Sequence, residues 1–312
     1  MKILIASKIH AHFMEEMQKA GYECEVNILK NSEELEPLIA DYQGIVVNSR
    51  FIIGKELIDK AKQLKFLARI GSGMESIDTA YLEQKGIRWF NSPEGNRQAV
   101  GEHTLGLLLN LLNKINIADK QVRKGLWIRE ANRGTEISGK TIGIIGYGNM
   151  GSAFARCLNG FDANVFAYDK YKSGYSDEFV CAKTMDEIFE QADVVSMHVP
   201  LTEETHYLVD DSFINSFRKN IYIINTSRGK VLNTSDLVAN MKNGKVLGVA
   251  LDVLEYESQS FEKIGLEKFP EPMQYLIQAE NVILTPHIAG WTVESNVKHA
   301  QVLAEKFFKA GF

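Results

Sequence analysis

Six consecutive residues, Gly146-Tyr147-Gly148-Asn149-Met150-Gly151, have the glycine spacing of a turn that binds a dinucleotide. They follow the apolar run 141–145, which is typical of a strand, and they open a helical pattern. Gly146 is expected to turn the chain, Gly148 to let the backbone approach a pyrophosphate, and Gly151 to let helix and strand pack closely. The start of the helix would offer free N–H groups and a positive dipole end to the phosphates.

An acidic residue stands where such a site needs one. Asp169 ends a second predicted strand and lies 18 residues after Gly151, near the usual separation of about 20. Its carboxylate would accept hydrogen bonds from both ribose hydroxyls and repel the 2′-phosphate of NADP, which favours NAD as the cofactor. Lys170 and Lys172 lie nearby, so strict selection of NAD over NADP is left open.

Strands and helices alternate along the whole chain, as the scaffold of this turn requires. The strands predicted in the first third are residues 2–6, 24–28, 44–48, 66–70 and 87–90, with helices at 13–20 and 55–61. A long helical pattern at 97–123 and a polar loop at 125–139 come next, followed by strands at 141–145, 164–168, 194–198, 221–225, 246–251 and 282–284. This alternation predicts an α/β fold with parallel sheets. The last helical segment, 292–308, has no strand to cover, so we expect it to return to the first domain.

Composition and charge limit the possible partners. A chain of 312 residues, 45% of them apolar, is long enough for two globular domains. A formal charge of -5 gives no reason to expect nucleic acid or an acidic membrane surface, and the most apolar stretch, 104–117, is shorter than a membrane span. The cysteines Cys24, Cys157 and Cys181 show no CxxC spacing, and the start of the chain lacks a signal peptide's apolar region. These features favour a cytoplasmic protein without a metal site.

Seven segments, one of them the glycine turn, together carry a family resemblance. The other six are Leu67-Ala68-Arg69-Ile70-Gly71-Ser72-Gly73-Met74-Glu75-Ser76-Ile77-Asp78, Ala99-Val100-Gly101-Glu102-His103, His198-Val199-Pro200-Leu201-Thr202, Asn225-Thr226-Ser227-Arg228-Gly229, Ala250-Leu251-Asp252-Val253 and Thr285-Pro286-His287-Ile288-Ala289-Gly290. In this order the chain resembles the D-isomer-specific 2-hydroxyacid dehydrogenases, and within them the phosphoglycerate dehydrogenase branch of serine biosynthesis.

The resemblance implies two Rossmann-like domains. An NAD-binding domain, residues 99–290, would be inserted in a discontinuous, flavodoxin-like substrate-binding domain made of residues 1–98 plus 291–312. Long members of the branch carry an additional regulatory domain after this part. Because the chain ends at Phe312, serine-type feedback through such a domain is not expected.

The chemistry implied by the resemblance agrees with the residue types. Reduction of a 2-keto acid needs a cation and a proton donor besides a hydride. Arg228 follows the strand 221–225, and its planar fork suits a carboxylate; His287 follows the strand 282–284, and histidine transfers protons near neutral pH. The family pairs this histidine with a glutamate, which by the family's count is Glu257, with Glu255 as the alternative. The carboxylate would raise the pKa of the imidazole and keep the acid protonated.

Further positions match residues that line the family's pockets. The turn Gly71-Ser72-Gly73 is expected to offer backbone N–H groups to the substrate carboxylate, with Ser72 also near the nicotinamide. The remaining matches to the cofactor pocket are Val199, Thr226, Ser227 and Asp252, of which Asp252 would accept from the carboxamide. We expect structural or surface roles for His103, His198 and His206, and no metal at His10 and His12.

The identity of the substrate stays open in the sequence. A phosphorylated substrate such as 3-phosphohydroxypyruvate needs further cations, for which Arg50 and Arg129 are candidates; Arg129 matches a place where the branch reaches across a dimer interface. The apolar 97–123 helix suits burial in such a homodimer. Hydroxypyruvate or glyoxylate reduction is the alternative, and an NAD-sensing scaffold like the corepressors of this fold is an alternative of another class. A formate-oxidising relative would have Gln in place of Glu257.

Trp291 would either narrow the pocket or pack against the final helix.

Overall fold

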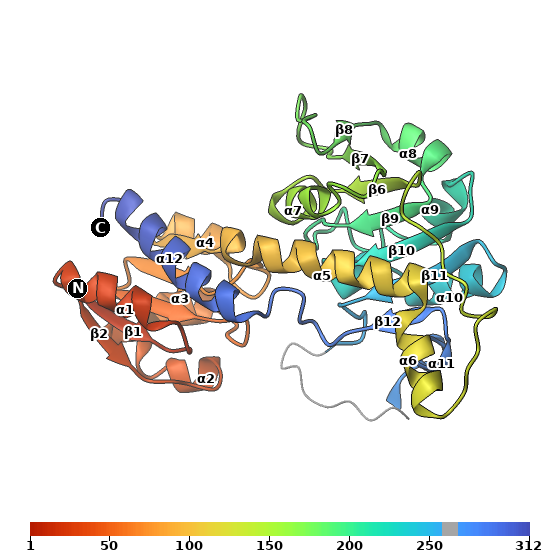
Figure 1. Cartoon of the computed structure of the whole chain (residues 1–312). Helices are drawn as coiled ribbons and strands as arrows, with labels where there is room; N and C mark the ends of the chain where they lie inside the picture. The colour runs from red at the N-terminus through yellow and green to blue at the C-terminus, as the bar shows by residue number, and fades with distance from the viewer. Residues whose placement is uncertain (258–267) are drawn as a thin grey trace. The chain divides into compact units, whose positions relative to one another are not determined.

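The computed structural model describes residues 1–257 and 268–312 (Figure 1). This chain divides into two compact units. Unit 1 comprises Met1–Arg97 and Trp291–Phe312, and unit 2 comprises Gln98–Gly290.

Unit 1 is built on a five-stranded parallel sheet in the order β2-β1-β3-β4-β5. The strands are β1 (Lys2–Ile5), β2 (Glu23–Val26), β3 (Gly44–Val47), β4 (Phe66–Arg69) and β5 (Arg88–Asn91). The helices are α1 (Ala11–Lys19), α2 (Ser32–Leu35), α3 (Lys55–Lys60), α4 (Thr79–Gln84) and α12 (Val293–Lys309), with a 3₁₀ turn η1 (Ile39–Asp41).

Alternate residues of these strands face opposite layers, as the period of a strand requires. Ile3 and Ile5 of β1 pack with α1 and α12, whereas Leu4 packs with α2, α3 and α4 on the other face. Figure 1 shows α12, the last element of the chain, lying beside α1. Its buried residue Phe307 contacts the aromatic ring of Phe66 at a centroid distance of 4.9 Å. The final helix therefore packs on the sheet of unit 1. This return to the first domain is what we expected of a helix that has no strand of its own to cover.

Unit 2 is built on a seven-stranded parallel sheet in the order β12-β11-β10-β9-β6-β7-β8. The strands are β6 (Thr141–Ile145), β7 (Asn164–Tyr168), β8 (Cys181–Ala182), β9 (Val194–Met197), β10 (Ile221–Asn225), β11 (Val246–Leu251) and β12 (Val282–Leu284). The helices are α5 (Pro93–Asn113, which begins in unit 1), α6 (Ile115–Arg123), α7 (Asn149–Cys157), α8 (Met185–Gln191), α9 (Asp211–Ser216), α10 (Thr234–Lys242) and α11 (Glu271–Gln278), with a 3₁₀ turn η2 (Gly229–Val231).

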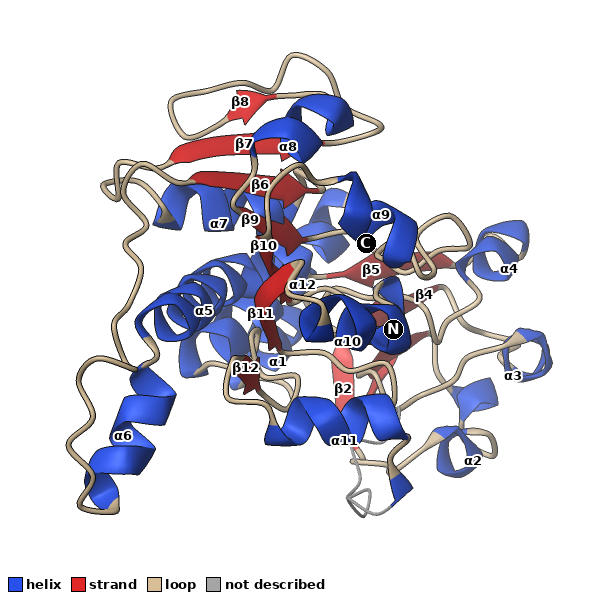
Figure 2. Cartoon of the chain, turned by 90° about the vertical axis from the view of Figure 1, so that its right-hand side faces the viewer, coloured by secondary structure: helices blue, strands red, loops and turns tan. Residues whose placement is uncertain are grey.

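Helices cover both faces of this sheet (Figure 2). Ile144 and Ile224 pack with the leucines of α5 and with Phe154 of α7. Their neighbours Ile145 and Ile223 face the opposite layer, formed by α8 to α11. Both faces are therefore buried, which explains why these strands read as continuous apolar runs.

The structure corrects the predicted long helix at 97–123. It begins earlier, with Pro93 at its first position, and it is interrupted at Lys114, whose backbone is left-handed with φ of 53°. The side-chain oxygen of Asn110 accepts from the N–H of Asn116 at 2.8 Å and so supports the break. The short edge strand β8 also went unpredicted, because two residues carry no periodic signal.

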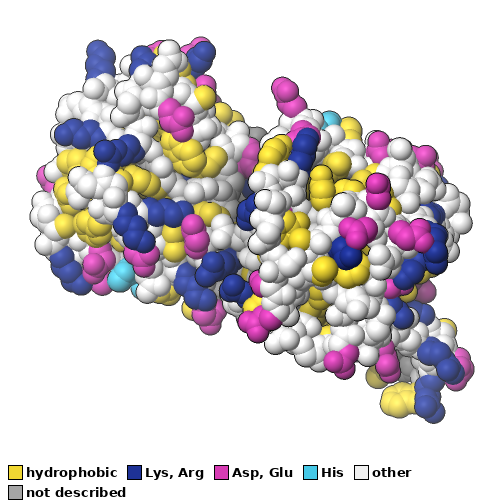
Figure 3. All heavy atoms as spheres, turned by 90° about the horizontal axis from the view of Figure 1, so that it is seen from above, with side chains coloured by type: hydrophobic (Ala, Val, Ile, Leu, Met, Phe, Trp, Pro, Cys, Tyr) yellow, Lys and Arg dark blue, Asp and Glu magenta, His cyan; other side chains and the backbone are white. Residues whose placement is uncertain are grey.

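Two surface properties bear on the predicted partners. Among residues 1–257 and 268–312, no helix combines the length and apolarity needed to cross a membrane. On the face shown in Figure 3, lysine and arginine side chains are interspersed with aspartate and glutamate in each unit.

Candidate active site

The glycine turn joins β6 to α7, as the sequence predicts. Gly146 has a φ of 93°, and a Cβ on it would lie 2.6 Å from the carbonyl oxygen of His198. A Cβ on Gly151 would lie 2.1 Å from the carbonyl oxygen of Gly146. By contrast, a Cβ on Gly148 would meet no described atom within 4 Å. Gly146 and Gly151 therefore serve the close packing of the turn, while Gly148 borders open space.

The start of α7 has the properties of an anion site. Gly148 is its N-cap residue, and no described side chain caps the helix by a hydrogen bond, so its first N–H groups can serve a phosphate. The turn also lies where the strand order reverses, between β9 and β7, and ligands of open α/β sheets bind at such a point. Val199, which follows β9, has its Cγ1 3.0 Å from the position of a Cβ on Gly146. The turn thus fits the dinucleotide that its spacing predicts.

Asp169 lies beside this turn at the end of β7. Its Oδ2 accepts from the N–H of Tyr147 at 2.9 Å, and its Oδ1 accepts from the N–H of Tyr171 at 3.0 Å. The nearby cations are also engaged, since Lys172 donates to the carbonyl oxygen of Tyr147 at 2.7 Å and Lys170 pairs with Glu204. The carboxylate is thereby fixed at the turn, the position that a ribose anchor needs.

A buried amide organises the loop that carries Arg228. Asn225, at the end of β10, is fully buried, and its Oδ1 accepts from both the N–H and the hydroxyl of Ser227 at 3.0 and 2.8 Å. Its Nδ2 donates to the carbonyl oxygen of Arg228 at 2.9 Å. The half-buried guanidinium of Arg228 donates to the carbonyl oxygen of Ser227 at 2.7 Å. Asn225 is a positioning residue that sequence reasoning missed, although the resemblance includes it.

Gly229 brings this loop against the segment that follows β11. A Cβ on Gly229 would lie 2.0 Å from the carbonyl oxygen of Leu254 and 2.6 Å from the N–H nitrogen of Glu255. Only a residue without a side chain permits this approach of the two backbones. The arginine loop and the glutamate segment are therefore held side by side.

His287 and Glu257 form a hydrogen-bonded pair. The Nδ1 atom of His287 lies 3.1 Å from Oε1 and 3.3 Å from Oε2 of Glu257. The histidine side chain is 30% exposed and the glutamate 26% exposed, so a small ligand can still reach the pair. Arg228, Glu257 and His287 follow β10, β11 and β12, which are neighbours in a parallel sheet. The three predicted catalytic residues therefore lie at the carboxyl ends of the strands of unit 2. The glycine turn, which follows β6, lies at the same carboxyl-terminal edge of the sheet.

The alternative partner, Glu255, is engaged elsewhere. Its Oε1 accepts from the hydroxyl of Tyr207 at 2.6 Å, and its Oε2 accepts from the N–H of Thr234 at 3.0 Å. Burial raises the pKa of Glu255, but the hydrogen bonds from Thr234 and Tyr207 outweigh it and hold the pKa below its usual value. The geometry thus selects Glu257 over Glu255 as the partner of His287.

Asp252 clamps the turn that contains His287. Its carboxylate is buried and accepts from the hydroxyl of Thr285 at 2.6 Å and from the N–H groups of Ile288 and Ala289 at 2.9 and 2.8 Å. Burial raises the pKa of Asp252, yet the hydrogen bonds from His103, Thr285 and the two N–H groups hold it below its usual value. The residue therefore stays charged and has a structural task beyond the predicted contact with a carboxamide.

The predicted substrate turn, Gly71-Ser72-Gly73, lies in unit 1 after β4. The N–H of Gly71 donates to the hydroxyl of the buried Ser92 at 3.0 Å, so it cannot also serve a substrate. Ser72 donates from its hydroxyl to Asn96 and accepts at its carbonyl oxygen from Asn91. In the described chain, the hydrogen bonds leave the N–H groups of Ser72 and Gly73 for a ligand. Of the three N–H groups predicted to bind the substrate carboxylate, that of Gly71 is therefore already used within the protein.

A buried histidine supports this turn from the final helix. The Nδ1 atom of His299 lies 2.8 Å from the hydroxyl oxygen of Ser92. His299 is 8% exposed, and its burial lowers the pKa of the ring to about 4. A Cβ on Gly95 would lie 2.6 Å from Nδ1, so the glycine makes room for the ring. This contact was not predicted, because Ser92 and His299 lie 207 positions apart in the chain.

The remaining candidates are on the surface. Arg50, after β3, and Arg129, in the loop after α6, are both exposed. Thr226 and Ser227 are buried, with their hydroxyls hydrogen-bonded to Thr104 and Asn225. Trp291 is 86% exposed, which argues against one of its two predicted alternatives, packing against the final helix.

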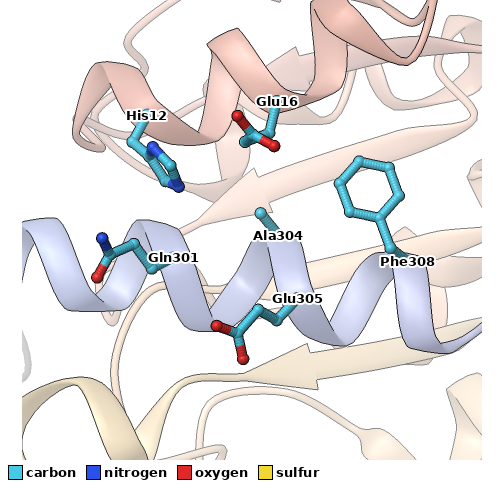
Figure 4. A pocket seen from close by; sticks show the side chains of 6 residues that line it. All are labelled: His12, Glu16, Gln301, Ala304, Glu305 and Phe308. Carbon is cyan, nitrogen blue, oxygen red and sulfur yellow. The ribbon is translucent and has the colours of Figure 1, made fainter.

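The histidine pair His10 and His12 lies at the start of α1 in unit 1. The Nδ1 atom of His10 accepts from the N–H of His12 and caps α1. Figure 4 shows His12 and Glu16 of α1 facing residues of α12. The hollow that they line has a volume of about 270 Å³. Within the described parts of the chain, no three His, Cys, Asp or Glu residues are grouped as a metal site.

Comparison with known proteins agrees with this arrangement. The family model "D-isomer specific 2-hydroxyacid dehydrogenase, NAD binding domain" matches residues 105–289. The chain is 34% identical to the D-3-phosphoglycerate dehydrogenase of Archaeoglobus fulgidus over 98% of its own length and 56% of that protein, so it spans about half of this relative. It is 33% identical to the hydroxypyruvate reductase of Thermotoga maritima, over 89% of its own length and 87% of that enzyme.

Solved structures give the same result. The D-lactate dehydrogenase of Aquifex aeolicus, complexed with NAD and lactic acid, has a TM-score of 0.84 and 27% identity and covers 100% of this chain and 96% of its own. The chain belongs to the D-isomer specific 2-hydroxyacid dehydrogenases, a family of NAD-dependent oxidoreductases that act on 2-hydroxy acids. NAD is the cofactor of the domain at 105–289.

Proposed function

We propose that the protein transfers a hydride between NAD(H) and a 2-hydroxy/2-keto acid. The observation that carries this proposal is the Glu257–His287 pair at the sheet edge that also carries the glycine turn. A histidine oriented by a carboxylate is a recurring arrangement for proton transfer. The residues proposed to hold the cofactor belong to unit 2, and the predicted substrate turn belongs to unit 1.

The residues of the chain divide the remaining chemistry among them. When bound, the nicotinamide of NADH supplies the hydride to the carbonyl carbon of the keto acid. His287 donates the balancing proton to the carbonyl oxygen from Nε2, since Nδ1 faces Glu257. Glu257 orients the ring and offsets the positive charge of its protonated form. In the oxidation direction His287 takes the hydroxyl proton back.

Arg228 would bind the substrate carboxylate and stabilise the charge that builds on the carbonyl oxygen. Its loop is tied to Asn225 and lies against Leu254 through Gly229. These contacts restrain the guanidinium relative to the glutamate segment. Such restraint is what orientation of a planar carboxylate needs.

For the substrate we propose 3-phosphohydroxypyruvate, the oxidised partner of 3-phosphoglycerate. β3 and β4 are neighbours in a parallel sheet, so Arg50 and the turn Gly71-Ser72-Gly73 lie at the same edge of unit 1. An exposed guanidinium near a turn with two free N–H groups supports a substrate with a second anionic group. Hydroxypyruvate and glyoxylate are the second candidates, supported by the similarity to the hydroxypyruvate reductase of Thermotoga maritima.

The test is NADH consumption with 3-phosphohydroxypyruvate, hydroxypyruvate, glyoxylate and pyruvate, each followed by absorbance. The proposal expects the highest kcat/KM with 3-phosphohydroxypyruvate, and an Arg50→Ala variant that loses this preference but still reduces hydroxypyruvate. If kcat/KM is highest with hydroxypyruvate, glyoxylate or pyruvate, which carry no phosphate, that acid replaces 3-phosphohydroxypyruvate as the substrate. NADH binding without turnover of any keto acid would instead support the corepressor-like scaffold.

We also propose a cytoplasmic homodimer. The surface of α6 and the loop after it exposes large apolar side chains, with Trp127 exposed by 81%. The other members of this apolar patch are Ile115, Val122, Leu126 and Ile128. The apolar face of α5 is already buried on its own sheet, so this patch, and not α5, is the surface that a second copy would cover.

The mass of the protein in solution tests the dimer. A Trp127→Asp variant places a charge in the apolar patch and should shift the light-scattering mass from two copies to one. An exposed site outside the patch, Tyr171→Asp, is the matched control and should leave the mass unchanged. A wild-type protein that is monomeric at micromolar concentration would overturn this assignment.

A further inference from the structure

The segment Ala99-Val100-Gly101-Glu102-His103 belongs to α5, and the proposed mechanism assigns it no task. Two adjacent residues of this helix contact the two loops that carry the catalytic residues. His103 reaches the loop of His287, and Thr104 reaches the loop of Arg228. One helix therefore touches both loops within unit 2.

His103 contacts two residues, Thr285 and Asp252, that hold the turn containing His287. Its Nε2 lies 3.2 Å from the hydroxyl oxygen of Thr285 and 3.5 Å from Oδ1 of Asp252. Thr285 in turn donates to the same Oδ1 at 2.6 Å. The imidazole thus adds a third polar contact on one oxygen of the buried carboxylate.

The contacts of Asp252 with this turn are important because His287 has an unusual backbone conformation. Its φ is 56°, in the left-handed region that non-glycine residues seldom adopt. Such a conformation persists only where surrounding contacts enforce it. The N–H of His287 donates to the carbonyl oxygen of Asp252 at 2.7 Å, and the N–H groups of Ile288 and Ala289 bind its carboxylate. Any shift of Asp252 would therefore move the catalytic ring.

The same helix is itself fixed against the rest of unit 2. A Cβ on Gly101 would lie 2.9 Å from the backbone of Ala153, so α5 approaches the dinucleotide helix α7 closely at this point. The hydroxyl of the fully buried Thr104 lies 3.2 Å from the hydroxyl of Thr226. These contacts give His103 a rigid base from which to hold Asp252.

We infer that His103 is a positioning residue for the reaction: through Thr285 and Asp252 it holds the turn that presents His287. The role rests on the proposed function, because it acts through the proposed proton donor. His103 itself touches neither substrate nor cofactor in this assignment. It should therefore affect kcat more than the binding of either ligand.

Three substitutions separate this role from simple packing. His103→Gln places an amide where Nε2 lies and should retain activity, whereas the shorter His103→Asn and the apolar His103→Leu cannot reach Thr285. For these two we expect kcat to fall about tenfold or more, with the KM for the keto acid and the Kd for NADH changed less than about twofold. His206→Ala is the matched control, since His206 is exposed and its ring contacts only the neighbouring Tyr207 among the described ring pairs, at an interplanar angle of 49°. A folded His103→Asn protein with wild-type kcat would overturn the inference.

Amide hydrogen exchange gives a readout that does not depend on turnover. Exchange at Ile288 and Ala289, which donate to Asp252, should accelerate about fivefold in His103→Asn and stay unchanged in His206→Ala. If the wild type reduces no keto acid, the proposed function fails, yet this exchange still tests the contact. Unchanged exchange in a folded His103→Asn protein would contradict the inference whatever the activity.

Discussion

The Nδ1 atom of His287 lies 3.1 Å from Oε1 of Glu257. In the proposed mechanism the other ring nitrogen, Nε2, donates the proton to the substrate. The contact between His287 and Glu257 also joins two loops that follow neighbouring strands, β11 and β12. The proposed proton transfer depends on this relationship.

Replacing Glu257 by Gln should reduce kcat for keto-acid reduction by a factor of about 100. The neutral amide still fits the space, but it no longer offsets the charge of the protonated ring. Steady-state turnover with NADH checks this expectation. A kcat within threefold of the wild type would remove Glu257 from the mechanism.

Glu255→Gln is the matched comparison, because Glu255 binds Tyr207 and Thr234 instead of His287. We expect this variant to lose about 1–3 kcal/mol of unfolding free energy while keeping most of its turnover. Urea denaturation and the same kinetic assay measure the two effects. A large loss of kcat at unchanged stability would mean that the two glutamates have been assigned the wrong way round.

The glycine turn predicts opposite effects for two alanine substitutions. Gly148→Ala should leave the melting temperature unchanged, since the added Cβ meets no described atom within 4 Å. It should nevertheless weaken NADH binding at least about tenfold, because the methyl group fills the space proposed for the pyrophosphate. Gly151→Ala should destabilise the fold by about 1–3 kcal/mol, since its Cβ would lie 2.1 Å from the carbonyl oxygen of Gly146. Unaltered NADH affinity in Gly148→Ala would move the cofactor away from this turn.

The buried His299 predicts a loss of stability in acid. Burial lowers the pKa of the folded ring to about 4, below the value of about 6.5 in an unfolded chain. The unfolded state therefore binds more protons between these values, and the free energy of unfolding falls as the pH drops through this window. The full loss below pH 4 is about 3 kcal/mol.

The matched variant is His299→Asn, whose amide can replace Nδ1 beside Ser92 but does not titrate. The difference in unfolding free energy between pH 7 and pH 4 should be smaller for this variant than for the wild type. Urea denaturation at the two pH values measures it. An identical pH dependence in both proteins would show that folding does not lower the pKa of the His299 ring, contrary to this prediction.

Much of the fold could be predicted from the sequence, because parallel strands buried on both faces form uninterrupted apolar runs. β10, β11 and β12 have the predicted bounds. The break at Lys114 was not predictable in this way, since lysine has no preference for a left-handed backbone. The true start at Pro93 did carry a signal, as proline favours the first turn of a helix.

The candidate site was predictable where chemistry requires a residue type next to a strand end, as for Arg228 and His287. Asn225 was not singled out, and His103 was expected to have a structural or surface role without a predicted partner. Asparagine and histidine are common polar residues, and their roles arise only when distant segments are brought together. Choosing Glu257 over Glu255 likewise needed the positions of Tyr207 and Thr234.

The proposed mechanism depends above all on proton donation by His287, and the decisive measurement is kcat for keto-acid reduction by the His287→Asn variant. Asparagine preserves a polar group near Nδ1 but has no acid to replace Nε2. If His287 is the proton donor, kcat falls at least about 100-fold while the Kd for NADH stays close to that of the wild type. A near-normal kcat in this variant would rule out His287 as the proton donor.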